Sequence, residues 1–450
     1  MNGTTASTQA GPSLFKNKVY MRVYSAYATA TFGDWFDALA IQVLVGYRWQ
    51  ASPLMLALIP VSIALPGILL GSFAGVAADR INKLKLMRMC DLLTALLTVL
   101  VLFAPSMVWL LPLLALRAAI STLNVPAQQS MTRSMVREDQ LLQATSLNGI
   151  VNQGSKIAGP LLGGFALSVL TPQWCILINA CLRGCSYLLL LTVKNSEVRQ
   201  GSPEQGAAEG KVSLSTMWRE GWGFMLRSRL LLTSMIFGLV GALVIQMIDF
   251  QFTSLFRLIA PTEEAMLGWL VAATGVGAII MIMLMNKMNR GTGYGWKLGM
   301  GYALIGVSVG GLGLLQPGAS ILSVLLLGFV LGLGNGMFMI TFNYCLQKET
   351  PPHMTGRVFG IQSTILSGVM IGAPLLGGLL VQYAGPSRIF LNFGIIIALI
   401  GVLGIAFGRV LWPTEKADGD SSLEQSKRNA GSVSSEGEFT PEERAVSVNQ

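Results

Sequence analysis

The sequence has little charge for its length, and this scarcity excludes most classes of soluble protein. Asp, Glu, Lys and Arg make up 12% of the 450 residues, and apolar residues make up 52%. Soluble domains carry about 25% charged residues, because their surfaces face water. The composition therefore predicts an all-α polytopic membrane protein, since helices satisfy their own backbone hydrogen bonds within a bilayer.

Residues that commonly perform catalysis or bind metals are also scarce. The chain has one histidine, His353, and five cysteines that show no metal-binding or disulfide spacing. No HExxH or Walker pattern occurs. We therefore expect no enzyme activity, no metal site and no cofactor. An intramembrane proton relay would have to use carboxylates, because the histidine lies in a connection between apolar runs.

Twelve apolar runs are each long enough for the roughly 20 residues that span a bilayer. Basic connections between these runs alternate with connections that hold almost no charge, so both termini are predicted to lie in the cytoplasm of a plasma-membrane protein. This topology explains the net charge of +9 without a nucleic-acid partner. The runs cover residues 20–47, 53–78, 86–104, 107–131, 141–170, 173–193, 229–256, 264–286, 296–316, 319–346, 355–384 and 387–411.

A polar segment in the middle of the chain divides the twelve spans into six and six. Its second part, from Val212 to Leu226, has the spacing of an amphipathic helix. The C-terminal tail is rich in Ser, Glu and Gly and is expected to be disordered. The predicted units are a cytoplasmic N-terminal tail (1–18), a six-helix bundle (19–194), a cytoplasmic linker with an amphipathic helix (195–228), a second six-helix bundle (229–411) and the disordered cytoplasmic tail (412–450).

An internal repeat supports two related halves. A run of small residues around a proline in the fifth span recurs 214 residues later in the eleventh span. Small residues at this spacing let a neighbouring helix approach closely, and the proline allows a bend. The pattern fits either a tight packing groove or a gating kink. Its residues are Gly154, Gly159, Pro160, Gly163 and Gly164 in the first copy, and Pro374, Gly377 and Gly378 in the second.

Residues 75–87 (GVAADRINKLKLM) form the densest cluster of charge between two long apolar runs. Gly75, Asp79 and Arg80 resemble the signature loop of the major facilitator superfamily, which lies between the second and third transmembrane helices. The resemblance implies that Asp79 faces the start of the eleventh span, where the helix dipole favours an anion, and that nearby cations complete a cytoplasmic gate. The residues assigned to this gate are Gly75, Asp79, Arg80, Lys83, Asp91 and Arg357.

Other stretches strengthen this resemblance over residues 15–412. The run GxxxxGPLLGG in the fifth span resembles the antiporter motif of major facilitator exporters, and Arg117 matches the position of that family's intramembrane arginine. FGDWFDALA in the first span is similar to the start of the macrolide and siderophore efflux branch. The resemblance implies the major facilitator fold, which is twelve transmembrane helices in two pseudo-symmetric six-helix bundles.

Ionisable residues within the spans are the candidates for transport chemistry, because charge is costly there. Asp34 and Asp37 lie one helical turn apart in the first span and suit a site that binds either a proton or a cationic substrate. Arg117 and Lys156 are expected to act on this pair, and Asp249 is a further candidate on the substrate path. The alternative is a structural pairing of the acids with Arg117, Lys156 or Arg183. The sequence leaves open whether Arg183 is structural or faces the substrate.

We predict a secondary active transporter that exports small amphipathic or cationic compounds by alternating access with proton antiport. The antiporter-like run favours export, and the expected partners are a small-molecule substrate, protons and the lipid bilayer around a monomer. A lipid or lysolipid flippase and a metabolite uptake facilitator remain alternatives within transport. A membrane sensor is the alternative outside it, although a sensor would be expected to carry an appended folded domain.

Overall fold

The computed structural model describes residues 14–194, 214–287, 293–351 and 354–412, and within these ranges it leaves out the side chains of residues 72–80, 138, 139, 142, 214–218, 286, 356 and 409. All the regular secondary structure of the described residues is helical, and these residues contain no strand. The helices are α1 Lys18–Val43, α2 Pro53–Arg80, α3 Lys83–Leu102, α4 Met107–Met135, α5 Glu138–Val169, α6 Pro172–Leu191, α7 Leu214–Arg227, α8 Arg229–Asp249, α9 Phe252–Ile259, α10 Ala265–Lys287, α11 Tyr294–Gly313, α12 Ile321–Glu349, α13 Thr355–Ala384, α14 Pro386–Ala406 and α15 Gly408–Leu411, with a 3-10 turn at Leu14–Lys16 (η1) and a π-helical turn at Leu44–Arg48 (η2).

Each of the twelve predicted spans coincides with a long helix, namely α1–α6, α8 and α10–α14. Within the described residues, eight of these helices are long and apolar enough to cross a membrane by length and composition. The other four are α1, α3, α5 and α11, and each has at least 20 residues. Charged, polar or glycine residues occur in each of these four, including the buried Asp37 of α1 and Asp91 of α3.

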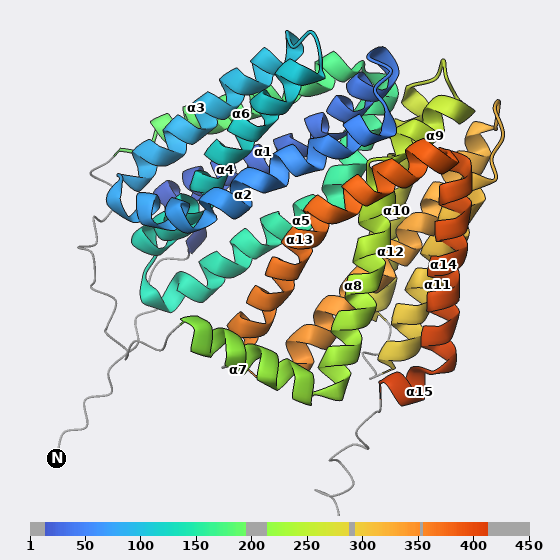
Figure 1. Ribbon diagram of the computed structural model, residues 1–450. Helices are drawn as coiled ribbons and strands as arrows, with labels where there is room; N and C mark the ends of the chain where they lie inside the picture. The colour runs from blue at the N-terminus through green and yellow to red at the C-terminus, as the bar shows by residue number, and fades with distance from the viewer. Residues whose placement is uncertain (1–13, 195–213, 288–292, 352–353, 413–450) are drawn as a thin grey trace, which may run out of the picture.

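The helices form two bundles that correspond to the two halves of the chain. Helices α1–α6 pack on one another in the first bundle, and α8 with α10–α14 do so in the second. Two helix pairs join the bundles, α5 with α10 and α2 with α13. Helices α5 and α13 are the fifth helices of their halves, and α2 and α10 are the second helices. The two contacts are therefore related by the pseudo-symmetry of the halves. Figure 1 shows the bundles meeting near α9 and lying further apart toward α7.

The glycine repeat sits at these junctions. A Cβ added at Gly163 would overlap the carbonyl group of Trp35 on α1, and one at Gly164 would lie 2.8 Å from the carbonyl oxygen of Gly268 on α10. In the second copy, a Cβ at Gly377 would overlap the carbonyl of Met247 on α8, and one at Gly378 would lie 2.9 Å from a carbonyl oxygen of α2. In both copies, therefore, the glycines allow close packing. Helix α5 or α13 can approach one helix of its own bundle and one helix of the other bundle at the same time.

Replacing Gly377 by alanine is therefore expected to destabilise the protein by about 1–3 kcal/mol, because backbone rather than a flexible side chain occupies the space. Gly372 on the same helix provides the matched control, since a Cβ there would meet nothing within 4 Å. Thermal unfolding of the two purified variants in detergent checks this. Equal unfolding temperatures for Gly377→Ala and Gly372→Ala would show that the close helix contact is not needed.

One face of the molecule is held closed by hydrogen bonds between the bundles. Arg257 of α9 donates to the carbonyl oxygens of Gly46 (3.1 Å) and Ala51 (2.9 Å), and Gln251 donates to the carbonyl oxygen of Pro53 (2.9 Å). Tyr47 donates in the other direction, to a carbonyl oxygen of the second bundle at 3.3 Å. These bonds bind η2 and the start of α2 to α9. The two bundles are thus joined, and the molecule is closed, at the face where α9 lies.

The predicted amphipathic helix of the linker is present as α7. It packs against α13 and α8 at the opposite face from α9, with Met225 buried in an apolar cluster between these helices. Glu220 of α7 forms an ion pair with Arg357 of α13 at 2.5 Å. Both side chains are partly exposed, so this pair adds little stability, and the apolar contacts hold α7 in place.

Candidate functional site

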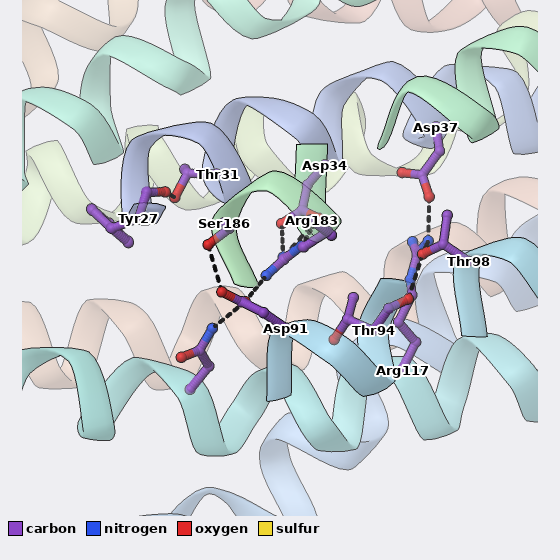
Figure 2. Close-up of polar contacts among 11 residues, drawn as sticks. Tyr27, Thr31, Asp34, Asp37, Asp91, Thr94, Thr98, Arg117, Arg183 and Ser186 are labelled. Atoms are coloured by element: carbon purple, nitrogen blue, oxygen red, sulfur yellow. Dashed lines mark hydrogen bonds and ion pairs between the residues drawn. The ribbon is translucent and has the colours of Figure 1, made fainter. Parts of the chain in front are cut away.

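The predicted acidic residues lie in a charge network inside the first bundle. Arg183 of α6 donates to both carboxylate oxygens of Asp34 at 2.5 and 2.8 Å, and to Asp91 of α3 at 3.1 Å. Ser186 donates to the second oxygen of Asp91 at 2.5 Å, and Asn124 of α4 donates to the first at 3.3 Å. Figure 2 shows Arg183 lying between the two carboxylates, which come from α1 and α3.

A second ion pair lies beside this network. Arg117 of α4 donates to Asp37 of α1 and also to the hydroxyl of Thr98 on α3, at 3.4 Å for the latter. The Asp37 side chain is fully buried, and that of Arg117 is 13% exposed. Arg117 therefore pairs with Asp37 and Arg183 pairs with Asp34, two of the pairings that the sequence left open as an alternative. The two acids of α1 face different partners, as Figure 2 shows.

The formal charges of the Arg183 network and the neighbouring Arg117–Asp37 pair, taken together, do not sum to zero. Three carboxylates, of Asp34, Asp37 and Asp91, face two guanidinium groups, so the formal charge is one negative. Asp37 and Asp91 are buried, whereas the side chain of Asp34 is 45% exposed. A single proton would make the network neutral. Asp34 is the member of the network that a proton can reach most easily.

The main cavity is separate from this network. It has a volume of about 560 Å³ and lies between α5 of the first bundle and α8, α10, α12 and α13 of the second. Its wall is largely apolar, with Met235, Phe338 and Met370 among the larger side chains. Among the described residues, Lys156 is the one charged side chain that lines it. The polar lining residues are Gln153, Lys156, Gln246, Thr274, Asn335, Asn343 and Gln362.

The cavity brings together only part of the predicted site. Lys156 and Pro160 line it, whereas Asp34 and Asp37 do not. Asp249 is the exposed last residue of α8 and is also not part of the wall. The structure therefore separates the residues that the sequence had combined into one site: Asp34 and Asp37 lie in the first bundle, Asp249 lies at the end of α8 in the second, and Lys156 lines the cavity.

The predicted gate residues are described only in part. At Gly75, Asp79 and Arg80 the structure describes the backbone alone, which continues α2. Lys83 is half-buried at the start of α3, and Arg357 pairs with Glu220 of the linker helix. Asp91, which the sequence assigned to this gate, is buried in the Arg183 network and does not lie at the surface of the molecule.

Sequence analysis missed the amide side chains of the cavity. Gln246 and Asn335 are polar residues within apolar runs, so the sequence does mark them. They were missed because only charged residues within the spans were considered. The expectation that the sequence holds no GxSxG spacing is also wrong, because residues 306–310 of α11 read GVSVG. Ser308 in this spacing is fully buried, and its hydroxyl donates to the carbonyl oxygen of Leu327 at 2.6 Å. It therefore lacks the exposed strand-to-helix turn of a hydrolase nucleophile.

Comparison with known proteins agrees with this geometry. The chain is 29% identical over 395 residues to the uncharacterized MFS-type transporter YfiS of Bacillus subtilis, covering 87% of this chain and 93% of that protein. It is 24% identical over 425 residues to the multidrug efflux pump Tap of Mycolicibacterium fortuitum, covering 90% and 97% of the two chains.

Solved structures share the fold at low sequence identity. The nucleoside transporter NupG superposes with a TM-score of 0.64 at 12% identity, covering 88% of this chain and 99% of its own. A bacterial homologue of the human lysosomal transporter Spinster, in an inward-facing conformation, gives a TM-score of 0.63 at 14% identity, covering 89% and 98%. Residues 23–373 match the Major Facilitator Superfamily. With its two six-helix bundles, the chain belongs to the Major Facilitator Superfamily of membrane transporters.

Proposed function

We propose that this transporter exports small amphipathic compounds by alternating access, driven by the entry of protons. The observation that carries the proposal is the unbalanced negative charge of the Arg183 network, whose exposed member is Asp34. Protonation of Asp34 would remove one of the two charges that pair with the buried Arg183 and leave Asp91 as its one carboxylate partner, so the contacts that Arg183 favours would change. The network is thus a means of coupling a proton to a helix movement.

Neighbouring residues connect Asp34 to the cavity. Trp35 follows Asp34 on α1, and a Cβ at Gly159 of α5 would overlap its indole ring. Gly159 precedes Pro160, and Lys156 lies one turn earlier on the same helix, so both cavity-lining residues are within a turn of the contact. A shift of α1 on protonation would therefore displace α5 at its proline, where the helix lacks one backbone hydrogen bond.

Two further observations support export of amphipathic compounds. The cavity combines apolar walls with a few polar groups, as sites for small organic molecules usually do. The Tap proteins to which this chain is similar are named as multidrug efflux pumps. We extend that function to this chain, acting as a monomer in the plasma membrane.

Transport by purified protein in liposomes tests the proposal. A pH gradient is imposed, and the panel contains anionic, neutral and cationic amphipathic compounds together with lysolipids. Accumulation that requires the gradient is expected, and the dissipation of the gradient should accelerate when a transported compound is added. Movement of lysolipid that is indifferent to the gradient would support flipping and overturn the proposal.

The predicted orientation of the chain in the membrane can be tested separately from transport. If both termini are cytoplasmic, the face with α9 is external, so a cysteine at the exposed Thr262 should react with a membrane-impermeant maleimide in intact cells. A cysteine at the exposed Arg219 of α7 should react only after the cells are opened. A cysteine-free background is needed, because Cys181 and Cys185 are exposed. The reverse labelling pattern would show that the orientation is inverted, and the proposed export would then be uptake.

A further inference from the structure

The polar groups of the main cavity are not those of a site for cations. Among the described lining residues there is no carboxylate, and the one charged group is the ammonium of Lys156. The three intramembrane acids of the first bundle are occupied by Arg183 and Arg117. A cationic compound entering this cavity would meet a like charge and find no described carboxylate in the wall to neutralise it.

Lys156 itself is available for a ligand. Its side chain is exposed in the cavity, and within the described part of the chain it makes no ion pair or hydrogen bond. It lies on α5, the one helix of the first bundle that contributes to the wall. Water can solvate the ammonium while the cavity is open, but closing the cavity would remove that water and leave the charge without a counter-ion. An unpaired buried charge is costly, so closure favours a bound anion.

We infer that the cavity selects compounds that carry an anionic group on an apolar body, with Lys156 as the counter-charge. The inference deepens the proposed function, because it names the substrate class of the same cavity. It replaces the cationic class expected from the sequence with the opposite charge. Carboxylates and sulfonates are the chemical groups that an ammonium at this position would bind.

The remaining wall fits such a molecule. Gln153 lies one turn from Lys156 on α5, and Gln246 of α8 and Gln362 of α13 add amide donors across the cavity. These amides have no hydrogen-bond partner among the described residues, so their N–H groups are free to bind oxygen atoms. Phe338 and Phe342 of α12, with several methionines, supply an adaptable apolar surface for the body of the ligand.

Three dansyl compounds with one fluorophore test the inference. Dansylglycine carries a carboxylate, dansylglycinamide is neutral and dansylcadaverine is cationic. Their equilibrium binding to the purified full-length protein in neutral detergent is measured by tryptophan-to-dansyl energy transfer. The wild type is expected to bind dansylglycine about tenfold or more tightly than dansylcadaverine, which corresponds to the loss of one charge-assisted contact.

Variants of one residue separate charge from packing. Lys156→Gln should weaken the binding of dansylglycine about tenfold while leaving dansylglycinamide within about twofold, Lys156→Arg should retain the preference, and Lys156→Glu should reverse it. Lys85→Gln removes the same charge at an exposed position on α3 and should change none of the three affinities. Tighter binding of dansylcadaverine by the wild type, or unchanged binding of dansylglycine by Lys156→Gln, would overturn the inference.

The measurement is independent of the direction and the energy source of transport. Binding at equilibrium needs no gradient, so an anion preference that depends on Lys156 stands even if the liposome experiment shows no proton coupling. Conversely, gradient-driven export of a cationic compound by the Lys156→Gln variant at the wild-type rate would preserve the proposed function and refute the assigned substrate class. The two failures are therefore distinguishable.

Discussion

Asp34→Asn is expected to abolish uphill export driven by a pH gradient while leaving slow downhill exchange. The amide imitates the protonated carboxyl group and cannot release a proton, so Arg183 would retain Asp91 as its one carboxylate partner in every state. Coupling needs a group that alternates between two charges, and Asp34 is the exposed member of a network that is one proton short of neutrality. A loss of at least about 100-fold in gradient-driven accumulation follows if this group is the coupling site.

Paired controls make the result specific. Asp37→Asn should show a milder defect, since Asp37 is fully buried and is paired with Arg117. Glu263→Gln removes an exposed carboxylate from the connection after α9 and should leave accumulation unchanged. Initial rates in liposomes across a range of internal and external pH give the comparison. If Asp34→Asn pumps at the wild-type rate with the wild-type pH dependence, the Arg183 network is structural and the coupling group lies elsewhere.

Arg183→Gln is expected to destabilise the protein by about 3–5 kcal/mol, because it leaves a buried carboxylate without its counter-charge. The Asp91 side chain is 2% exposed and would retain only the hydroxyl of Ser186 and the amide of Asn124 as partners. Asp34 would be affected less, since its 45% exposed carboxylate can be solvated. The expected effects are poor yield and a much lower unfolding temperature in detergent.

A second substitution distinguishes this charge effect from a loss of packing. Adding Asp91→Asn to Arg183→Gln removes the orphaned charge and should recover a large part of the lost stability. Arg388→Gln, at an exposed position near the start of α14, should change stability by no more than about 0.5 kcal/mol. Equal destabilisation in the single and double variants would show that the volume of Arg183, and not its charge, holds α1, α3 and α6 together.

The spans could be predicted from the sequence because the bilayer dictates their length and polarity. Even α1, α3, α5 and α11, in which charged, polar or glycine residues interrupt the apolar sequence, could be predicted, since the connections around them are marked by charge, proline or glycine. The repeat around Pro160 and Pro374 likewise predicted two related halves, and the structure adds its physical reason. Gly163 and Gly377 occupy equivalent contacts, with Trp35 of α1 and Met247 of α8 respectively.

The pairing inside the bundle could not be predicted, because it depends on the rotation of each helix about its axis. Asp34 and Asp37 are three residues apart and were expected to act as one pair, but Asp34 meets Arg183 of α6 and Asp37 meets Arg117 of α4. The position of the cavity depends on rotation in the same way. Sequence analysis identified Lys156 as an intramembrane cation, but the sequence does not reveal that α5 turns it toward the second bundle and away from the acids.

The central claim, that protonation of Asp34 alternates access to the cavity, is tested most directly by spin-label distances across both faces of one protein. Labels at Gln143 and Gln347 report on the face with α7, and labels at Arg48 and Thr262 report on the face with α9, all at exposed positions. On raising the pH in the presence of a transported compound, the first distance should shorten and the second should lengthen, and Asp34→Asn should abolish both responses. Distances that stay constant with pH, or that change equally in the wild type and in Asp34→Asn, would contradict the account.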